Sequence, residues 1–409
     1  MPANERRRVL SSAGSAGTIL RGEVRKGSEA PVRAGLRAAI GDVLGPRPVT
    51  ALRDHLEAAM RWLGRAQDAA GGGVARSYAL RWMRAHGRRG WLAAYPETTG
   101  YIIPTLFAYA RLTGDEEYRR RAVRMAQWET EVQLDSGAVQ GGVIGFPPTP
   151  AVFNTGQVLF GWARAFDETG DEQFRKAAVH AAEFLLDAQD LDGAWRRHGS
   201  RYARAGVNVY DARTAWGLLE AARVTGDRRY RQAAIRNLDF ALSQQASNGW
   251  FAECCLDDNR RPLLHTLAYT LEALVEAGLA LDEPRYVVAA RRAAVVLTRR
   301  LHADGGLPGR FDSGWRPAAG WSCLTGNAQI AIVWLRLFEA TRDAELLEAA
   351  RRANRFLMAS QDLAARDPGV RGGIKGSHPV WGGYAPWEYP SWAAKFFADA
   401  LILEQRLVG

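Results

Sequence analysis

Apolar residues recur at helical spacing along most of the chain, in pairs of segments that differ in character. In each pair an apolar segment rich in small residues, such as TGYIIPTLFAYARL (99–112), precedes a segment with one charged face, such as YRRRAVRMAQWETEVQ (118–133). A short Thr-Gly-Asp turn lies between the two. Glycine suits the residue that follows a helix, and aspartate suits the residue that caps the next one. The pattern therefore predicts a helical hairpin as the repeating unit of the fold.

The hairpins repeat along the chain with a long period. The turn occurs three times at intervals of 56 residues and twice more in diverged form, as TGDEEY (113–118), TGDEQF (169–174), TGDRRY (225–230), LDEPRY (281–286) and TRDAEL (341–346). A second motif, in which Gln is followed by Gly and Trp, closes the units and is clearest in FLLDAQDLDGAW (184–195) and ALSQQASNGWF (241–251). Regular repeats of this length predict one continuous array of hairpins.

A count of the segments predicts how the array closes. The charged segments end near Gln67, Gln133, Gln189, Gln245, Leu301 and Gln361. The apolar segments begin near Glu97, Asn154, Asp211, His265 and Asn327, and the C-terminal segment 391–405 supplies a sixth. We therefore expect an all-α fold, a single (α/α)6 toroid of six helical hairpins over residues 49–409, with no β-sheet beyond short hairpins. The Gln, Gly and Trp positions resemble the QW motif of squalene–hopene cyclases and, more broadly, the hairpin repeats of (α/α)6 toroids such as six-hairpin glycosidases, and this resemblance implies the same fold.

Charge divides the chain into two parts. The formal net charge is +10, and residues 1–48 contain nine basic and four acidic residues among many Arg, Gly, Ser and Ala. This composition predicts a disordered basic N-terminal arm over residues 1–48. The other half of the excess charge is dispersed over the charged helix faces, and no groove-reading motif is present, so no nucleic-acid partner is expected.

The chain also lacks the sequence features of a membrane or secreted protein. No stretch reaches 18 apolar residues, and the basic residues Arg6, Arg7 and Arg8 are not followed by the apolar region of a secretion signal. Three cysteines, Cys254, Cys255 and Cys323, are too few for a disulfide framework. We expect a cytoplasmic protein with no membrane span, no cofactor and no bound metal; the oligomeric state stays open.

Polar residues stand at equivalent positions where the apolar helices begin, 16 to 18 residues before each hairpin Asp: Glu97, Asn154, Asp211, His265 and Asn327. In a toroid these helix N-termini gather on one face, where backbone N–H groups and positive dipole ends converge. Glu and His are poor helix caps, which favours a functional role for Glu97 and His265. For the other three, capping of the helix and a functional role both remain open.

The loops that lead to these helices are rich in aromatic residues and glycine. Flat aromatic faces with interspersed carboxylates, amides and arginines are what binds a sugar ring. The sequence therefore predicts a carbohydrate-active enzyme with a carbohydrate substrate. The candidate catalytic residues are Glu97, Tyr101, Tyr210, Asp211 and His265. The candidate substrate-binding residues are Asn154, Arg213, Tyr269, Trp321, Asn327, Trp381, Tyr384, Trp387 and Glu388.

Several reactions fit these residues. Hydrolysis needs a carboxylate pair, for which Glu97, Asp211 and Glu388 are candidates. Proton abstraction from C5 of a uronic acid, in a lyase or an epimerase, needs Tyr or His as base and acid, with Arg or Asn beside the sugar carboxylate. The segments FPPTPAVFNTG (146–156) and NVYDARTAW (208–216) are similar to the helical C-terminal domain of glucuronyl C5-epimerases. That resemblance implies a catalytic Tyr210, followed in register by Asp211 and Arg213, and an oligo- or polysaccharide that contains uronic acids.

Three other classes remain as alternatives. An isoprenoid or terpene cyclase would need a D-x-D-D motif, and Asp190-Leu191-Asp192 is followed by glycine. A zinc-dependent toroid enzyme would draw its ligands from Cys254, Cys255, Cys323 and His265, whose spacing matches no zinc signature. A non-catalytic toroid that binds a glycan or a peptide is the third.

Overall fold

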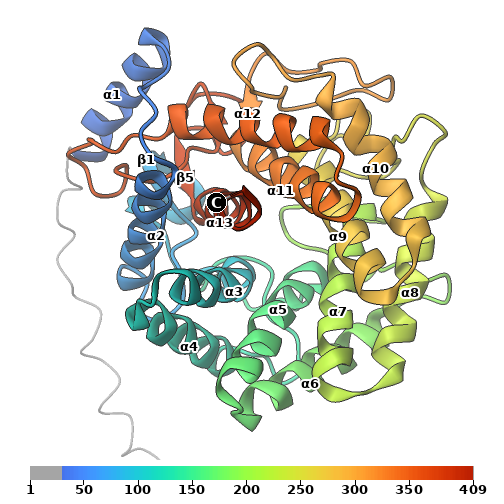
Figure 1. The fold of residues 1–409 in the computed structure, drawn as a ribbon. Helices are drawn as coiled ribbons and strands as arrows, with labels where there is room; N and C mark the ends of the chain where they lie inside the picture. The colour runs from blue at the N-terminus through green and yellow to red at the C-terminus, as the bar shows by residue number, and fades with distance from the viewer. Residues whose placement is uncertain (1–29, 409) are drawn as a thin grey trace, which may run out of the picture.

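The computed structural model describes residues 30–408, which form two concentric rings of helices (Figure 1). The outer ring consists of α2 (Leu52–Asp68), α4 (Glu116–Glu131), α6 (Glu172–Ala188), α8 (Arg228–Ser243), α10 (Pro284–Thr298) and α12 (Ala344–Ser360). The inner ring consists of α3 (Pro96–Thr113), α5 (Val152–Thr169), α7 (Ala212–Thr225), α9 (Leu264–Leu281), α11 (Leu324–Thr341) and α13 (Ser391–Val408). Helix α13 packs against α11, α3 and α2, so the last inner helix closes the ring. The prediction of an all-α (α/α)6 toroid is confirmed.

The turn motif works as its residues predict. Gly114 follows α3 with φ of 74°, a left-handed conformation that glycine adopts without strain, and Asp115 accepts a hydrogen bond from the backbone N–H of Glu117 at 3.0 Å. The same arrangement recurs at the next two hairpins. In the two diverged turns Asp282 and Arg342 occupy the left-handed position instead of glycine.

The closing motif ties each hairpin to the next. Gln189 Nε2 donates to Gly193 O at 3.1 Å within its own loop and to Ala233 O at 2.9 Å on α8. Gln133 and Gln245 make the same pair of bonds one hairpin before and one hairpin after. A Cβ at position 193 would lie 2.5 Å from the backbone oxygen of Arg236, so only glycine permits this close approach. The motif therefore locks neighbouring outer helices together.

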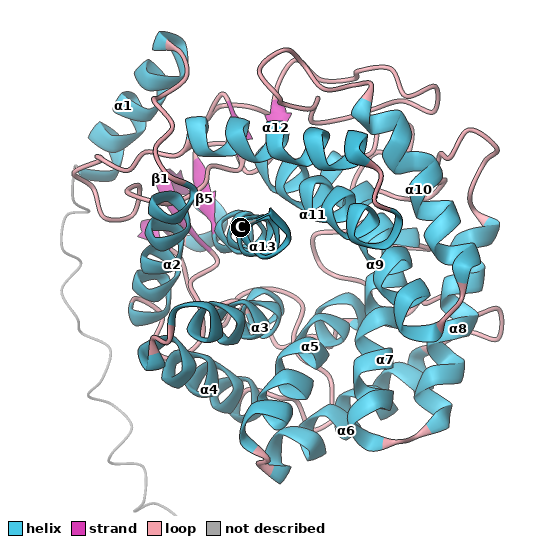
Figure 2. Cartoon of the chain, in the orientation of Figure 1, coloured by secondary structure: helices cyan, strands magenta, loops and turns pink. Residues whose placement is uncertain are grey.

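Small sheets join loops that are distant in the sequence. Strand β1 (Ser77–Met83) lies between β2 (Arg88–Trp91) and β5 (Glu388–Pro390), all antiparallel, and β3 (Ser322–Cys323) pairs with β4 (Ser377–His378). Figure 2 shows β1 and β5 beside α2 and α13, where the ring closes. The expectation of hairpins alone is wrong in this respect, because ring closure places the first and last loops side by side and their backbones pair.

The structure differs from the expected arm over residues 30–44, which form helix α1 (Ala30–Leu44). Ala34 and Ala38 are buried, and the side chain of Asp42 accepts hydrogen bonds from Lys375 Nζ and, at 2.8 Å, from the backbone N–H of Val380. A buried ion pair thus holds this helix on the segment before β4. Residues 1–29 of the expected arm lie outside the described residues. No helix between residues 30 and 408 is long and apolar enough to cross a membrane.

Candidate active site

The loops from outer to inner helices gather on one face of the toroid, which we call the mouth. The five polar residues predicted at the starts of the inner helices lie there, in or directly before the first turn of their helices. The side chains of Asn154, Asp211 and Asn327 cap none of these helices. The structure therefore shows no helix-capping role for these three side chains.

Glu97 is the centre of a hydrogen-bonded group in the mouth. It is 8% exposed and accepts a hydrogen bond from the hydroxyl of Tyr95, to which Asn154 Nδ2 donates at 3.1 Å. Burial raises the pKa of Glu97 to about 7, although the Tyr95 hydrogen bond and the positive charges of Arg76 and Arg213 act in the opposite direction. Glu97 therefore changes its protonation state much closer to neutral pH than an ordinary carboxyl group does.

Asp211 ends the 3-10 turn Val209–Asp211 and is 5% exposed. Its carboxyl group makes no hydrogen bond to any described residue, and burial alone raises its pKa well above the ordinary value. With Phe153, Asn208 and Tyr210 it lines a small cavity between the 195–211 loop and the start of α5. Burial therefore favours the neutral form of Asp211, which suits this carboxyl group to donate a proton.

Aromatic rings connect these groups around the mouth. The ring of Tyr269 lies 4.3 Å from that of His265 and 5.2 Å from that of Phe153, which lies 5.2 Å from Tyr210. Burial, with contributions from Asp211 and Glu97, raises the pKa of Tyr210 well above its usual range. The ionisation of Tyr210 is therefore coupled to that of both carboxyl groups.

His265 and two tyrosines complete this ring of side chains. Burial lowers the pKa of His265 to about 4, and its Nδ1 lies 2.6 Å from Gln329 Oε1. Because that oxygen only accepts, the proton lies on Nδ1 and Nε2 is left as an acceptor. The ring of His265 lies 5.3 Å from Tyr384, and Tyr101 packs against Phe396 at 5.6 Å.

The other expected binding residues have varied surroundings. Asn327 bonds to the backbone of Leu307 and Cys323 and so fixes a loop. Trp321 packs against glycines 309 and 383, where a Cβ would collide with its ring. Trp381 is 45% exposed, with its ring 6.4 Å from that of Trp387.

Arg213 lies beneath the mouth. It is 2% exposed, and its Nη1 donates to Glu272 Oε2 at 2.5 Å. The structure thus differs from the expectation that Arg213 meets a sugar carboxylate, because a buried partner already occupies it.

Sequence reasoning missed a second arginine that faces the site. Arg76, just before β1, pairs with Glu388 at 2.5 Å, and its guanidinium carbon lies 5.1 Å from the ring of Trp392 and 5.7 Å from that of Tyr202. Tyr95 lies in one of the aromatic-rich loops expected at the mouth, but it was not singled out as a candidate catalytic or binding residue, although it stands two residues before Glu97. Neither residue occupies a repeated position, so the period of the sequence carried no signal for them.

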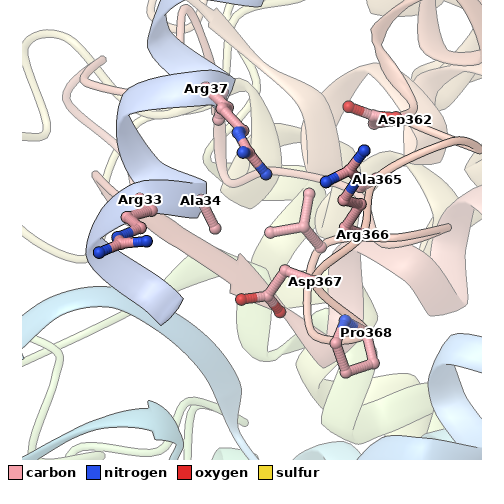
Figure 3. Close-up of a pocket in the computed structure, with 10 residues that line it drawn as sticks. Arg33, Ala34, Arg37, Asp362, Ala365, Arg366, Asp367 and Pro368 are labelled. Atoms are coloured by element: carbon pink, nitrogen blue, oxygen red, sulfur yellow. The ribbon is translucent and has the colours of Figure 1, made fainter. Parts of the chain in front are cut away.

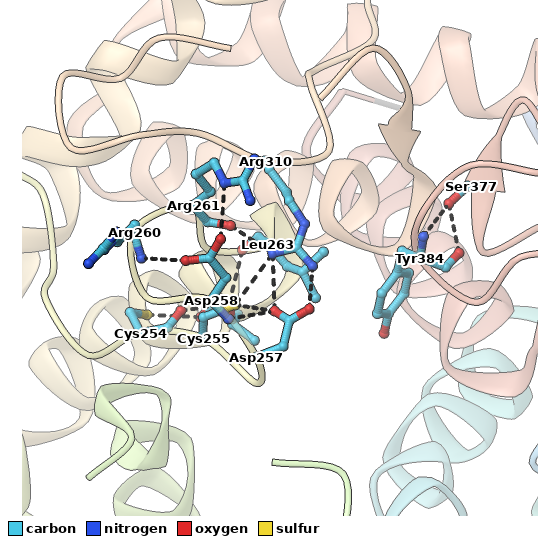
Figure 4. Close-up of polar contacts among 11 residues, drawn as sticks. Cys254, Cys255, Asp257, Asp258, Arg260, Arg261, Leu263, Arg310, Ser377 and Tyr384 are labelled. Carbon is cyan, nitrogen blue, oxygen red and sulfur yellow. Dashed lines mark hydrogen bonds and ion pairs between the residues drawn. The ribbon is translucent and has the colours of Figure 1, made fainter. Parts of the chain in front are cut away.

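A polar cluster at one side of the mouth involves two of the cysteines (Figure 4). Arg310 Nη2 binds Asp257 Oδ2 at 2.6 Å, and the thiol of Cys255 donates to Asp257 Oδ1 at 3.1 Å. Cys254 lies 3.3 Å from the hydroxyl of Thr270. Within residues 30–408 no group of three His, Cys, Asp or Glu side chains is arranged to hold a metal ion.

A larger cavity, of about 450 Å³, lies outside the mouth between α1 and the 362–370 segment (Figure 3). Arginines 33, 37 and 366 surround it, with Asp362 and Asp367. None of the expected site residues lines this cavity.

The overall likeness to known structures is clear, whereas no family model matches the sequence and no curated protein matches it. Chains with the same fold include an unsaturated glucuronyl hydrolase from Bacillus sp. GL1, responsible for the degradation of glycosaminoglycan (TM-score 0.69, 18% identity, 88% of this chain and 98% of that one). Another is an unsaturated glucuronyl hydrolase specific for heparin (TM-score 0.68, 17% identity, 87% and 97%). A third, from Streptococcus agalactiae, was solved with dGlcA-GalNAc6S (TM-score 0.62, 14% identity, 93% and 98%). The likeness shows that this chain has the (α/α)6 toroid fold of these hydrolases. It extends over nearly the full length of these hydrolases.

Proposed function

We propose that this chain is a carbohydrate-active hydrolase that acts on oligosaccharides ending in an unsaturated uronyl residue. The observation that carries the proposal is the pair of buried carboxyl groups, Glu97 and Asp211, in an aromatic mouth. The solved structures of unsaturated glucuronyl hydrolases that share this fold support the substrate class.

The chemistry of this substrate suits a buried acid. The C4=C5 double bond of an unsaturated uronyl residue is an enol ether, because C5 also carries the ring oxygen. Asp211 would add its proton to C4, which leaves positive charge shared by C5 and the ring oxygen. Water would then add to C5 and lose a proton to the carboxylate of Glu97. The hemiketal so formed opens at the bond between C5 and the ring oxygen, which leaves a ketone at C5 and a hemiacetal at C1. The C1–O glycosidic bond of this hemiacetal then breaks, which leaves an aldehyde at C1 and releases the neighbouring sugar, with one water consumed overall.

The protonation states favour this reaction over abstraction of the C5 proton. Burial raises the pKa of Tyr210 and Tyr269 well above the ordinary phenol value, so neither is suited to act as a phenolate base. A proton donor and a weak base are what the site offers. Elimination and epimerisation, which were open from the sequence, are therefore less well supported than hydrolysis.

The test is an assay with unsaturated uronyl disaccharides prepared by a polysaccharide lyase. We expect the absorbance of the conjugated double bond to disappear and a new reducing sugar to form, and Asp211→Asn to abolish both. New absorbance from a saturated polyuronate would identify a lyase instead. Deuterium uptake at C5 without bond cleavage would identify an epimerase.

We also propose that residues 49–409 act as one catalytic domain in the cytoplasm. The three cysteines are free and buried, which suits a reducing compartment.

A further inference from the structure

A layer of polar side chains crosses the interior of the toroid directly beneath the mouth. We call it the polar belt; it consists of Gln157 on α5, Arg213 on α7 and Glu272 on α9. Arg213 donates from Nε to Gln157 Oε1 at 2.8 Å and from Nη1 to Glu272 Oε2 at 2.5 Å. The three side chains are between 0 and 5% exposed. The belt is therefore a buried ion pair with a neutral hydrogen-bond partner.

Arg213 of the polar belt contacts several aromatic rings of the site. The guanidinium carbon of Arg213 lies 5.9 Å from the ring of Tyr101, 5.1 Å from that of Tyr269 and 5.2 Å from that of Phe396. Tyr269 in turn contacts the ring of His265. A planar cation held in contact with several ring faces restricts their orientation as well as adding attraction.

The belt also sets the charge beneath Glu97. Two cations act on that carboxyl group: Arg76, from the segment before β1, and Arg213, from α7. Arg76 is paired with Glu388 at 2.5 Å. Glu97 in turn raises the pKa of the phenols around it. These are Tyr95 from the preceding loop, Tyr101 from α3, Tyr202 from the 197–206 loop, Tyr210 from the 3-10 turn and Tyr269 from α9.

We propose that the Arg213–Glu272 pair is a positioning device of the active site, in which Glu272 holds Arg213 as one fixed positive charge beneath Glu97 and against the rings of Tyr101 and Tyr269. The proposal assigns no contact with substrate to either residue. The proposal rests on the proposed function only in the activity assay; the titration of Glu97 tests it independently.

The decisive experiment follows the titration of Glu97 by NMR in the full chain, with ¹³C-labelled glutamate side chains and Glu97→Gln to assign the signal. Arg213→Gln should raise the pKa of Glu97, since a nearby positive charge is lost. Glu272→Gln should lower it, because the charge of Arg213 is then less compensated. The double variant R213Q/E272Q, which leaves no buried charge unpaired, should again raise it and guards against misfolding of the single variants.

A matched control is Arg336→Gln, which breaks another ion pair between inner helices, Arg336–Glu276 at 2.6 Å, and should leave the titration of Glu97 unchanged. The proposal is overturned if the two single variants move the pKa of Glu97 in the same direction, if the double variant leaves it where it is, or if the control moves it equally.

Activity gives a second and separable reading. In the assay on unsaturated disaccharides, the acid limb of the plot of kcat/KM against pH should move to higher pH in R213Q/E272Q, by the same amount as the NMR titration. If the wild type cleaves no such substrate, the proposed function fails while the titration still tests the belt. If the titration fails while the wild type is active, only the belt is refuted.

Discussion

Glu129, on outer helix α4, is a buried carboxyl group that the proposed reaction does not use. It is fully buried, and neither of its carboxylate oxygens has a hydrogen-bond partner among the described residues. Glu129 stands four residues before Gln133, and the residue four before each equivalent position (Gln67, Gln189, Gln245, Leu301 and Gln361) is apolar in the other five hairpins: Leu63, Leu185, Ala241, Leu297 and Leu357. Burial alone raises the pKa of Glu129 well above its ordinary value.

Replacement of Glu129 by Leu should therefore stabilise the protein, and more so as the pH rises. An acid whose pKa is higher in the folded state binds more protons when folded than when unfolded. The free energy of unfolding of the wild type is therefore highest below the unfolded pKa of 4.5 and decreases as the pH rises towards the folded pKa. While the group stays protonated only in the folded state, each pH unit costs the wild type about 1.4 kcal/mol. At acid pH the gain is smaller, about 1–3 kcal/mol, from removal of an unpartnered polar group.

The assay is urea unfolding of the wild type, Glu129→Leu and Glu129→Gln at pH values from 5 to 8. The difference in free energy of unfolding between each variant and the wild type should increase with pH at the same slope, because neither variant ionises at this position. Their mutual difference should not depend on pH. Stability differences from the wild type that stay constant across this pH range would refute the reasoning, because they would mean that Glu129 is ionised in the folded protein.

Three further outcomes are expected. Asp211→Asn should lower kcat on unsaturated disaccharides by about 100-fold or more, as loss of a general acid does, while KM changes little. Wild-type kcat/KM should fall below a pH of about 7 as Glu97 becomes protonated, and Tyr95→Phe should move this limb to higher pH by removing a hydrogen bond to the ionised form. Asp42→Asn should leave Lys375 as an unpaired buried cation, cost about 3 kcal/mol or more in thermal unfolding, and expose α1 to trypsin.

The repeated parts of the fold were predictable from sequence because the same residue types recur at the turn and at the junction of successive hairpins. Gly114 and Asp115 mark a turn, and Gln189 with Gly193 marks a junction between outer helices. The inner-helix starts could be counted back from those turns. The sheet that joins β1 to β5 could not, because its strands pair only after the ring has closed.

The site was predictable only where it coincides with the repeat. Glu97, Asp211 and His265 stand at repeated positions, and the structure brings their surroundings together through Tyr210 and Tyr269. Arg76 and Tyr95 lie in irregular loops, whose path depends on the packing of distant segments. Arg213 was found, but its pairing with Glu272, 59 residues away, depends on a side-chain direction that spacing does not encode.

Glu129 and Asp211 carry the same burial cost with opposite consequences for activity, and comparing them separates structure from function. Neither carboxyl group has a hydrogen-bond partner within residues 30–408, and burial alone raises the pKa of each. Replacement of either ionisable group by a residue that does not titrate should therefore stabilise the fold at neutral pH by the same linkage. Asp211 stands in the mouth, so Asp211→Asn should be more stable and inactive, whereas Glu129→Leu should be more stable and fully active. If Glu129→Leu lost activity as well, Glu129 would influence the site from the outer ring, and the division of the toroid into a reactive mouth and an inert outer ring would be wrong.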